Sequence, residues 1–66
     1  MTKLRLVTPS TDSTIATNID RGYADILVKA IAAEPGIHDI DAIYTDENGD
    51  DFEFDFDRNT FGPPTD

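Results

Sequence analysis

The feature that most constrains the fold of this chain is the alternation of acid and phenylalanine in DDFEFDFD, residues 50–57. Successive side chains of a β-strand point to opposite faces of the sheet. A strand with this sequence therefore puts Phe52, Phe54 and Phe56 on one face and carboxylates on the other. The rings must be buried against another element. The segment therefore predicts a strand that borders a small core and carries an acidic outer face.

A second apolar segment, IHDIDAIYT, precedes this strand, and DENGD between the two indicates a hairpin turn. A tight Asn48-Gly49 turn would mix rings and acids on each face of the hairpin. A longer loop over residues 47–49, with glycine at the left-handed position beside a G1 bulge, sorts them. Burial favours this second register, which makes three apolar pairs: Tyr44 with Phe52, Ala42 with Phe54, and Ile40 with Phe56.

The rest of the chain predicts one more strand and one helix. A period of two over residues 3–8 indicates a strand that Pro9 ends, and the turn-rich PSTDST reads as a linker. Apolar residues at helical spacing predict a helix at about 18–33, with Thr17 as its N-cap and EPG as its end. A helix start nearer Ser13 is the alternative.

These elements predict an α+β fold of order β-α-β-β, in which one helix packs on one face of a three-stranded sheet and the other face is acidic. We expect one domain over residues 1–58 and an irregular tail over 59–66. The strand partner of residues 3–8 stays open, and a parallel pairing would require a right-handed crossover. The expected core consists of Leu4, Leu6, Ile19, Tyr23, Ile26, Leu27, Ile31, Ile40, Ala42, Tyr44, Phe52, Phe54 and Phe56.

Charge is concentrated in the second half of the chain. The 66 residues carry a net charge of −9, and all of it falls in residues 37–66, where ten carboxylates face one arginine. Such a surface repels nucleic acid and anionic membranes, so neither is an expected partner. The chain has no cysteine and no apolar run that would make a signal peptide or a membrane span. A cytoplasmic location is expected, which for a viral protein is the host cytoplasm.

The candidate site is acidic and has two parts. Like charges across a sheet destabilise it, so we expect these acids to serve contact with a basic partner as well as solubility. Alternate carboxylates on a strand lie about 6.8 Å apart, a spacing of the same general size as that of phosphates along DNA. The expected outer face carries Asp39, Asp41, Asp51, Glu53, Asp55 and Asp57, and the expected hairpin tip carries Asp46, Glu47 and Asp50.

Other chemistries find little support in the sequence. DENGDD matches the spacing of a calcium loop poorly, because the glycine arrives too early. His38 is the only histidine and reads as a surface residue. The serines lack a base in a nucleophile motif, and no glycine-rich phosphate loop is present. We therefore expect no enzyme activity, no metal site and no cofactor.

The sequence favours a small inhibitor or regulator that binds the basic surface of a nucleic-acid-binding protein. Small acidic phage proteins of the anti-CRISPR or anti-restriction type work in this way by imitating DNA, and the analogy is one of charge, not of fold. One alternative is a salt-adapted assembly subunit that self-associates through a sheet edge, which would make it a homodimer. Another is an antitoxin or immunity protein with the same electrostatics.

Overall fold

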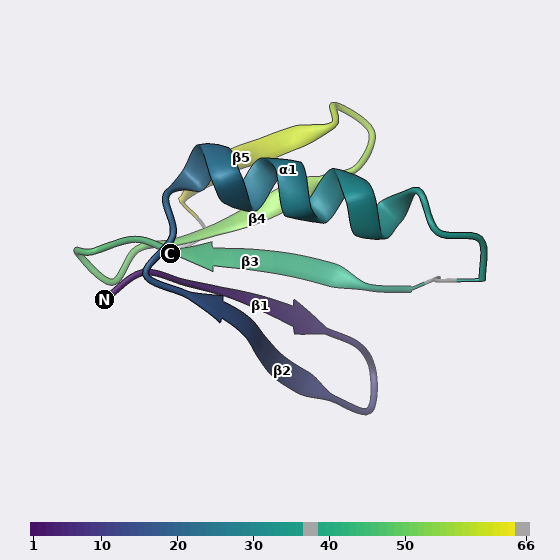
Figure 1. Cartoon of the computed structure of the whole chain (residues 1–66), viewed down its shortest axis with the longest axis horizontal. Coiled ribbons are helices and arrows are strands. Elements are labelled where there is room, and N and C mark those ends of the chain that lie inside the picture. The colour runs from purple at the N-terminus through teal and green to yellow at the C-terminus, as the bar shows by residue number, and fades with distance from the viewer. Residues whose placement is uncertain (37–38, 65–66) are drawn as a thin grey trace.

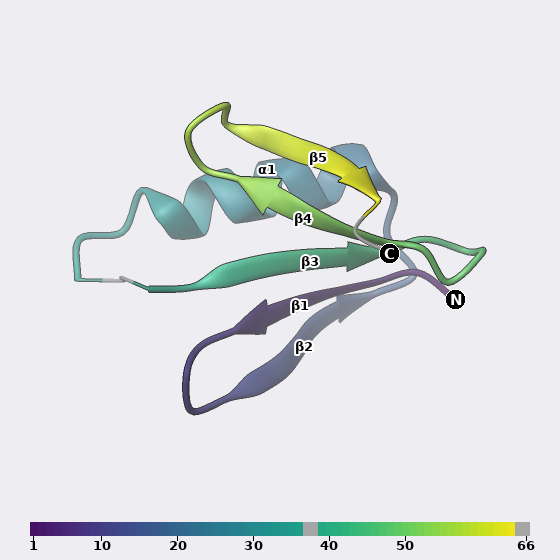
Figure 2. The same ribbon diagram turned by 180° about the vertical axis from the view of Figure 1, so that it is seen from behind.

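The computed structural model describes residues 1–36 and 39–64, and it shows one helix packed on a five-stranded antiparallel sheet (Figures 1 and 2). The strands lie in the order β2-β1-β3-β4-β5. Every neighbouring pair is antiparallel. The elements are β1 Lys3–Val7, β2 Asp12–Thr17, α1 Arg21–Ala32, β3 Asp41–Thr45, β4 Asp51–Asp55 and β5 Thr60–Pro64.

The expected three-stranded β-α-β-β sheet is wrong, because two further strands extend it at its edges. β2 occupies part of the expected linker and runs on to Thr17, the expected N-cap of the helix, so the alternative helix start near Ser13 is also wrong; β5 occupies the expected irregular tail. β1 pairs with β3 in antiparallel fashion, so the parallel crossover that the sequence left open does not occur.

The first extra strand follows a tight turn at Pro9 and Ser10. The backbone N–H of Thr8 donates to the carbonyl of Thr11 at 2.8 Å, and the Thr8 hydroxyl accepts from the N–H of Thr11 at 3.0 Å. The chain therefore reverses and pairs with β1, with a register shift at Leu4/Arg5. The sequence of β2, DSTIAT, contains turn-forming residues, but its β-branched threonines and isoleucine suit a strand once β1 offers a partner.

The second extra strand is held by aromatic contacts. Phe61 pairs opposite Phe54 across β4 and β5, with ring centroids 5.0 Å apart and planes at 88°. Pro63 and Pro64 have no N–H to donate to a sheet, which is why the segment reads as irregular. An edge strand has a neighbour on one side only, so only some of its backbone N–H groups must donate to the sheet. β5 is an edge strand and therefore accommodates both prolines.

The helix begins at Arg21, three residues later than expected. Asp20 is its N-cap, since its Oδ1 accepts from the N–H of Tyr23 at 2.7 Å, whereas Thr17 belongs to β2. Asn18 between them is left-handed, with φ 58°, and its N–H donates to the carbonyl of Thr2 at 2.9 Å. The helix ends at Ala32, close to the expected end.

The hydrophobic core is smaller than expected and uses another side of the helix. Ala24 and Val28 point inward, while Tyr23 and Ile26, both expected in the core, are 52% and 62% exposed. Phe56 also leaves the core, because β4 ends at Asp55. The buried residues are Leu4, Ala24, Val28, Ala42, Tyr44 and Phe54, with Leu6, Ala16, Ile19, Leu27, Phe52 and Phe61 packed around them.

Candidate acidic interface

The β3–β4 hairpin sorts its rings and acids as the sequence predicts. Tyr44 pairs with Phe52 and Ile43 with Glu53, which is the register of the longer loop. Phe54 is buried on the helix side, so its neighbours in β4, Glu53 and Asp55, point to the opposite side of the sheet. We call the helix-free side of the hairpin the acidic face; it carries Asp41, Asp51, Glu53 and Asp55.

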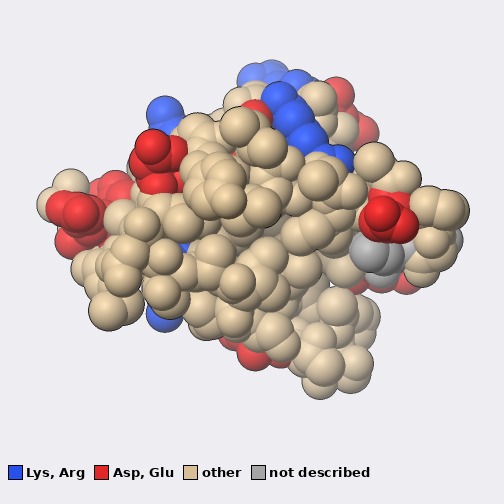
Figure 3. Space-filling model, viewed as in Figure 1, with Lys and Arg blue, Asp and Glu red and all other residues tan. Residues whose placement is uncertain are grey.

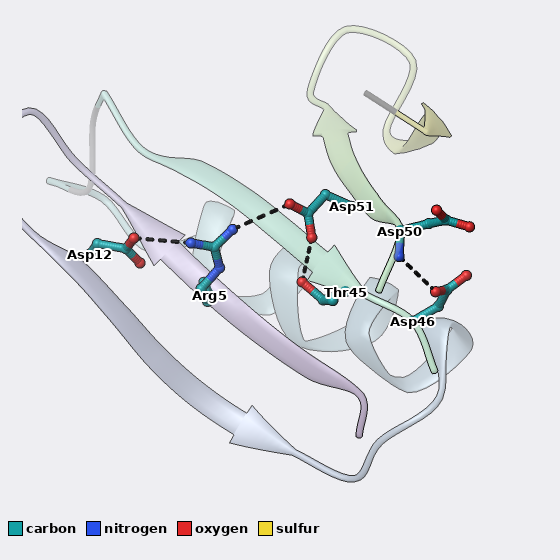
Figure 4. A network of polar contacts seen from close by, with 6 residues as sticks. All are labelled: Arg5, Asp12, Thr45, Asp46, Asp50 and Asp51. Carbon is teal, nitrogen blue, oxygen red and sulfur yellow. Dashed lines mark hydrogen bonds and ion pairs between the residues drawn. The ribbon is translucent and has the colours of Figure 1, made fainter. Parts of the chain in front are cut away.

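The middle of the acidic face is neutralised by Arg5 of β1 (Figure 4). Its Nη1 lies 3.0 Å from Oδ2 of Asp12 on β2, and its Nη2 lies 3.7 Å from Oδ2 of Asp51 on β4. The Thr45 hydroxyl donates to the other oxygen of Asp51. Asp51 is thus committed to contacts within the sheet. Sequence reasoning did not identify Arg5 as the cation that relieves this part of the face.

Beyond Asp51 the carboxylates surround a hollow at the far end of β4. Asp41, Glu53, Asp55 and Asp57 line this shallow hollow of about 540 Å³, together with Phe54, Phe56, Gly62 and Pro63. We call it the β4-end hollow. It brings together four of the acids that the sequence predicts as site residues.

Among the acids of the β4-end hollow, Asp55 makes contacts that hold its own turn, and the other three do not pair with a Lys or Arg of the described residues. Asp55 holds the turn after β4: its Oδ1 accepts from the N–H groups of Asp57 at 2.9 Å and Arg58 at 3.2 Å. Its Oδ2 lies 3.8 Å from Nε of Arg58. Among residues 1–36 and 39–64, no Lys or Arg nitrogen lies within 4.0 Å of the carboxylates of Asp41, Glu53 or Asp57. These three are available to an external cation.

The hairpin tip is built around Asp46. Its Oδ1 accepts from the N–H groups of Asn48 at 2.9 Å and Asp50 at 3.0 Å. Gly49 has φ 85°, the left-handed conformation expected for the longer loop. Asp46 is therefore structural, while Glu47 and Asp50 are exposed.

A second hollow, of about 630 Å³, opens beside the tip, and sequence reasoning missed one of its acids. Asp46 and Glu47 line it together with Asp20, the helix N-cap. Asp20 is far from the tip in sequence; it lies there because the link from β2 to the helix passes beside Thr2, whose carbonyl accepts from the N–H of Asn18. Among the described residues, no group of acids and histidine has the arrangement of a metal site.

Two remaining sequence predictions lie at the start of β3. Asp39 is exposed, with φ 58°, two residues before the strand begins, so it is not part of the acidic face. His38 lies outside the described residues.

Comparison of the chain with protein-family models, with curated proteins and with solved structures gives no significant match. In the part of the chain that the structure describes, no helix has the length and apolar character needed to cross a bilayer.

Proposed function

We propose that this protein binds the basic surface of a nucleic-acid-binding protein and so acts as an inhibitor or regulator by contact, without catalysis, in the cytoplasm. The observation that carries the proposal is the β4-end hollow, where Asp41, Glu53 and Asp57 have no cation within 4.0 Å among the described residues. Uncompensated carboxylates around a concave surface are suited to receive Lys and Arg side chains of a partner.

The exposed tip acids extend this surface along the hairpin. Glu47 and Asp50 lie at one end of β4, and the β4-end hollow lies at the other. β4 has five residues and spans about 14 Å. Glu53, at its middle, lies about 10 Å along the strand from Asp50, and Asp57 lies beyond the far end of the strand. Between the two groups of charge, Arg5 holds Asp51 in place. The pattern offered to a partner is two negative regions on one rigid hairpin.

Imitation of DNA is the finer form of the proposal. Phosphates are regularly spaced, and a basic groove that accepts several of them would accept two rigid groups of carboxylates. The net charge of −9 would speed the encounter with such a groove and make binding weaken as salt is added.

The test is a binding titration against purified nucleases, repressors and CRISPR effectors, with duplex DNA as competitor. We expect binding to at least one of them, with DNA and the protein excluding each other. Glu53→Gln and Asp41→Asn should each weaken that binding severalfold at 0.1 M salt. Asp25→Asn is the matched control: it removes the same charge from a carboxylate that pairs with Lys29 at 2.8 Å on the helix. Equal loss in all three variants would show that net charge alone acts, and the site would be wrong.

A further inference from the structure

The helix has an apolar side that its own sheet does not cover. Tyr23 and Ile26 are 52% and 62% exposed, and Ala30 on the same side of the helix is exposed too. We call these three residues the apolar flank. A surface helix normally turns a polar side to water, so this flank calls for an explanation.

The position of the polar side shows where the apolar flank points. Arg21, Asp25 and Lys29 line a hollow together with Thr60 and Phe61 of β5. They therefore lie on the side of α1 that faces β5. At about 100° per residue, Tyr23 lies on the opposite side of the helix from these residues. In the strand order β2-β1-β3-β4-β5 that side faces β1 and β2.

The helix does not lie over the whole sheet. In Figure 1 it runs across β4 and alongside β3, while β1 and β2 lie clear of it on the far side of β3. Ala16 pairs with the buried Leu4, so Ala16 and Leu6 face the helix side, where they are only partly buried. Figure 3 shows uncharged side chains from the lower side of the helix across the β1–β2 hairpin, with carboxylates mainly at the margins. We call this surface the open face.

We propose that the open face is the contact surface for a second copy of this chain, in a two-fold symmetric dimer. The face supplies both halves of such a contact: a projecting apolar flank and an uncovered strip of sheet beside it. A two-fold axis places the apolar flank of each copy over β1 and β2 of the other, which makes the interface self-complementary. The two helices then lie between two sheets.

The helix side of the molecule, of which the open face is part, is large enough for the interface of a small dimer. Viewed down its shortest axis, as in Figures 1 and 3, the molecule measures 33 by 25 Å. A rounded outline of these dimensions encloses roughly 650 Å², near the lower end of the area that each partner buries in a specific interface. Use of most of this side of the molecule would reach the lower range for a stable complex.

Charge and core size both favour a second copy over a basic partner here. The carboxylates visible in Figure 3 lie mainly at the margins, so the face offers few ion pairs to a cationic protein, and two copies meet without bringing acidic clusters face to face. In the part of the chain that the structure describes, the buried core has six apolar residues, of which two are alanines, and the sequence has no cysteine. Chains of this size commonly gain stability from oligomers. The acidic face lies on the other side of the sheet, so the dimer is independent of the proposed function and leaves that site open.

Sedimentation equilibrium tests the proposal and its physical basis together. We expect a species of twice 7.3 kDa that becomes more populated as NaCl rises from 0.1 to 1 M, because salt screens repulsion between two acidic chains and strengthens apolar contact. The melting temperature of the unaltered chain should rise with its concentration. A monomer at all salt concentrations up to about 0.5 mM, a concentration at which a dimer with a micromolar Kd would be largely formed, would overturn the proposal. So would a dimer that salt dissociates, which is the behaviour of ion pairing.

Variants locate the interface. Ile26→Ser and Tyr23→Ser should each raise the Kd of the dimer at least about tenfold, because each change occurs twice in a symmetric interface. Ala32→Ser, on the same helix but outside the apolar flank, is the control and should leave the Kd unchanged. A dimer that both flank variants leave intact would mean that another surface, such as the β2 edge, joins the copies. If a flank variant fails to fold, the concentration dependence of melting in the unaltered chain still decides between dimer and monomer.

Discussion

At the scale of single residues, Arg5 decides how much negative charge the sheet displays. It contacts Asp12 on the neighbouring strand β2 and, across β3, Asp51 on β4, and its own side chain is only 23% exposed. Its Nε is buried and has no hydrogen-bond partner among residues 1–36 and 39–64. The residue therefore gives up some solvation, and the two carboxylates compensate for that loss.

Replacing Arg5 should destabilise the fold more than replacing an ordinary surface cation. Arg5→Met keeps most of the aliphatic stem but leaves Asp12 and Asp51 without their cation, so we expect a loss of about 1–2 kcal/mol in the free energy of unfolding at low salt. Lys29→Met removes the same charge from an exposed i,i+4 pair with Asp25 and should cost only about 0.3–0.5 kcal/mol. Urea unfolding of both variants gives the comparison. Equal losses would mean that the Arg5 contacts add nothing specific.

The acids of the hairpin could be placed from sequence, but their cation could not. The alternation of rings and acids depends on neighbouring residues, and burial of Phe54 enforces it. Arg5 and Asp51 meet only because β1 lies beside β3, and strand order is set by long-range packing. Asp46 and Asp55 were also expected to contact a partner. In the structure, one oxygen of each accepts hydrogen bonds from backbone N–H groups of its own turn.

At the scale of elements, the strands that sequence reasoning missed are the two at the edges of the sheet. β2 and β5 have weak strand sequences, and each depends on a neighbour that is already in place. The central strands β1, β3 and β4 were recognised because their apolar and polar residues alternate, and this alternation indicates which side of the strand is buried. The helix was recognised as well, but its inward side was not, since apolar residues occupy more than one side of it.

β5 should contribute to stability through Phe61. Its ring lies 5.0 Å from that of Phe54 and 6.0 Å from that of Tyr44, so it covers one end of the core. Phe61→Ala should cost about 2–3 kcal/mol, less than a fully buried phenylalanine. Phe56→Ala is the control: that ring also contacts Phe54 but is 41% exposed, and we expect a loss of about 1 kcal/mol. Small, equal losses in chemical denaturation would indicate that residues 60–64 add little to the core.

At the scale of the whole molecule, the two sides of the sheet differ in charge and in burial. The helix side holds a small core and the open face, and the other side holds the acids that Arg5 only partly balances. With a net charge of −9, the folded chain carries a cost in self-repulsion that a more neutral sequence would avoid. The proposed function and the dimer each account for one side of this arrangement.

Neutralising the β4-end hollow should therefore stabilise the fold while it removes binding. In a triple variant, Asp41→Asn, Glu53→Gln and Asp57→Asn, three like charges disappear from one surface. We expect a gain of at most about 1 kcal/mol in the free energy of unfolding at 0.05 M NaCl, because exposed charges interact weakly, and no gain at 1 M NaCl, where repulsion is screened. Urea unfolding at equal chain concentration in both salts measures the difference. A triple variant that is less stable than the unaltered chain at low salt would show that these acids support the fold, and their retention would then need no partner to explain it.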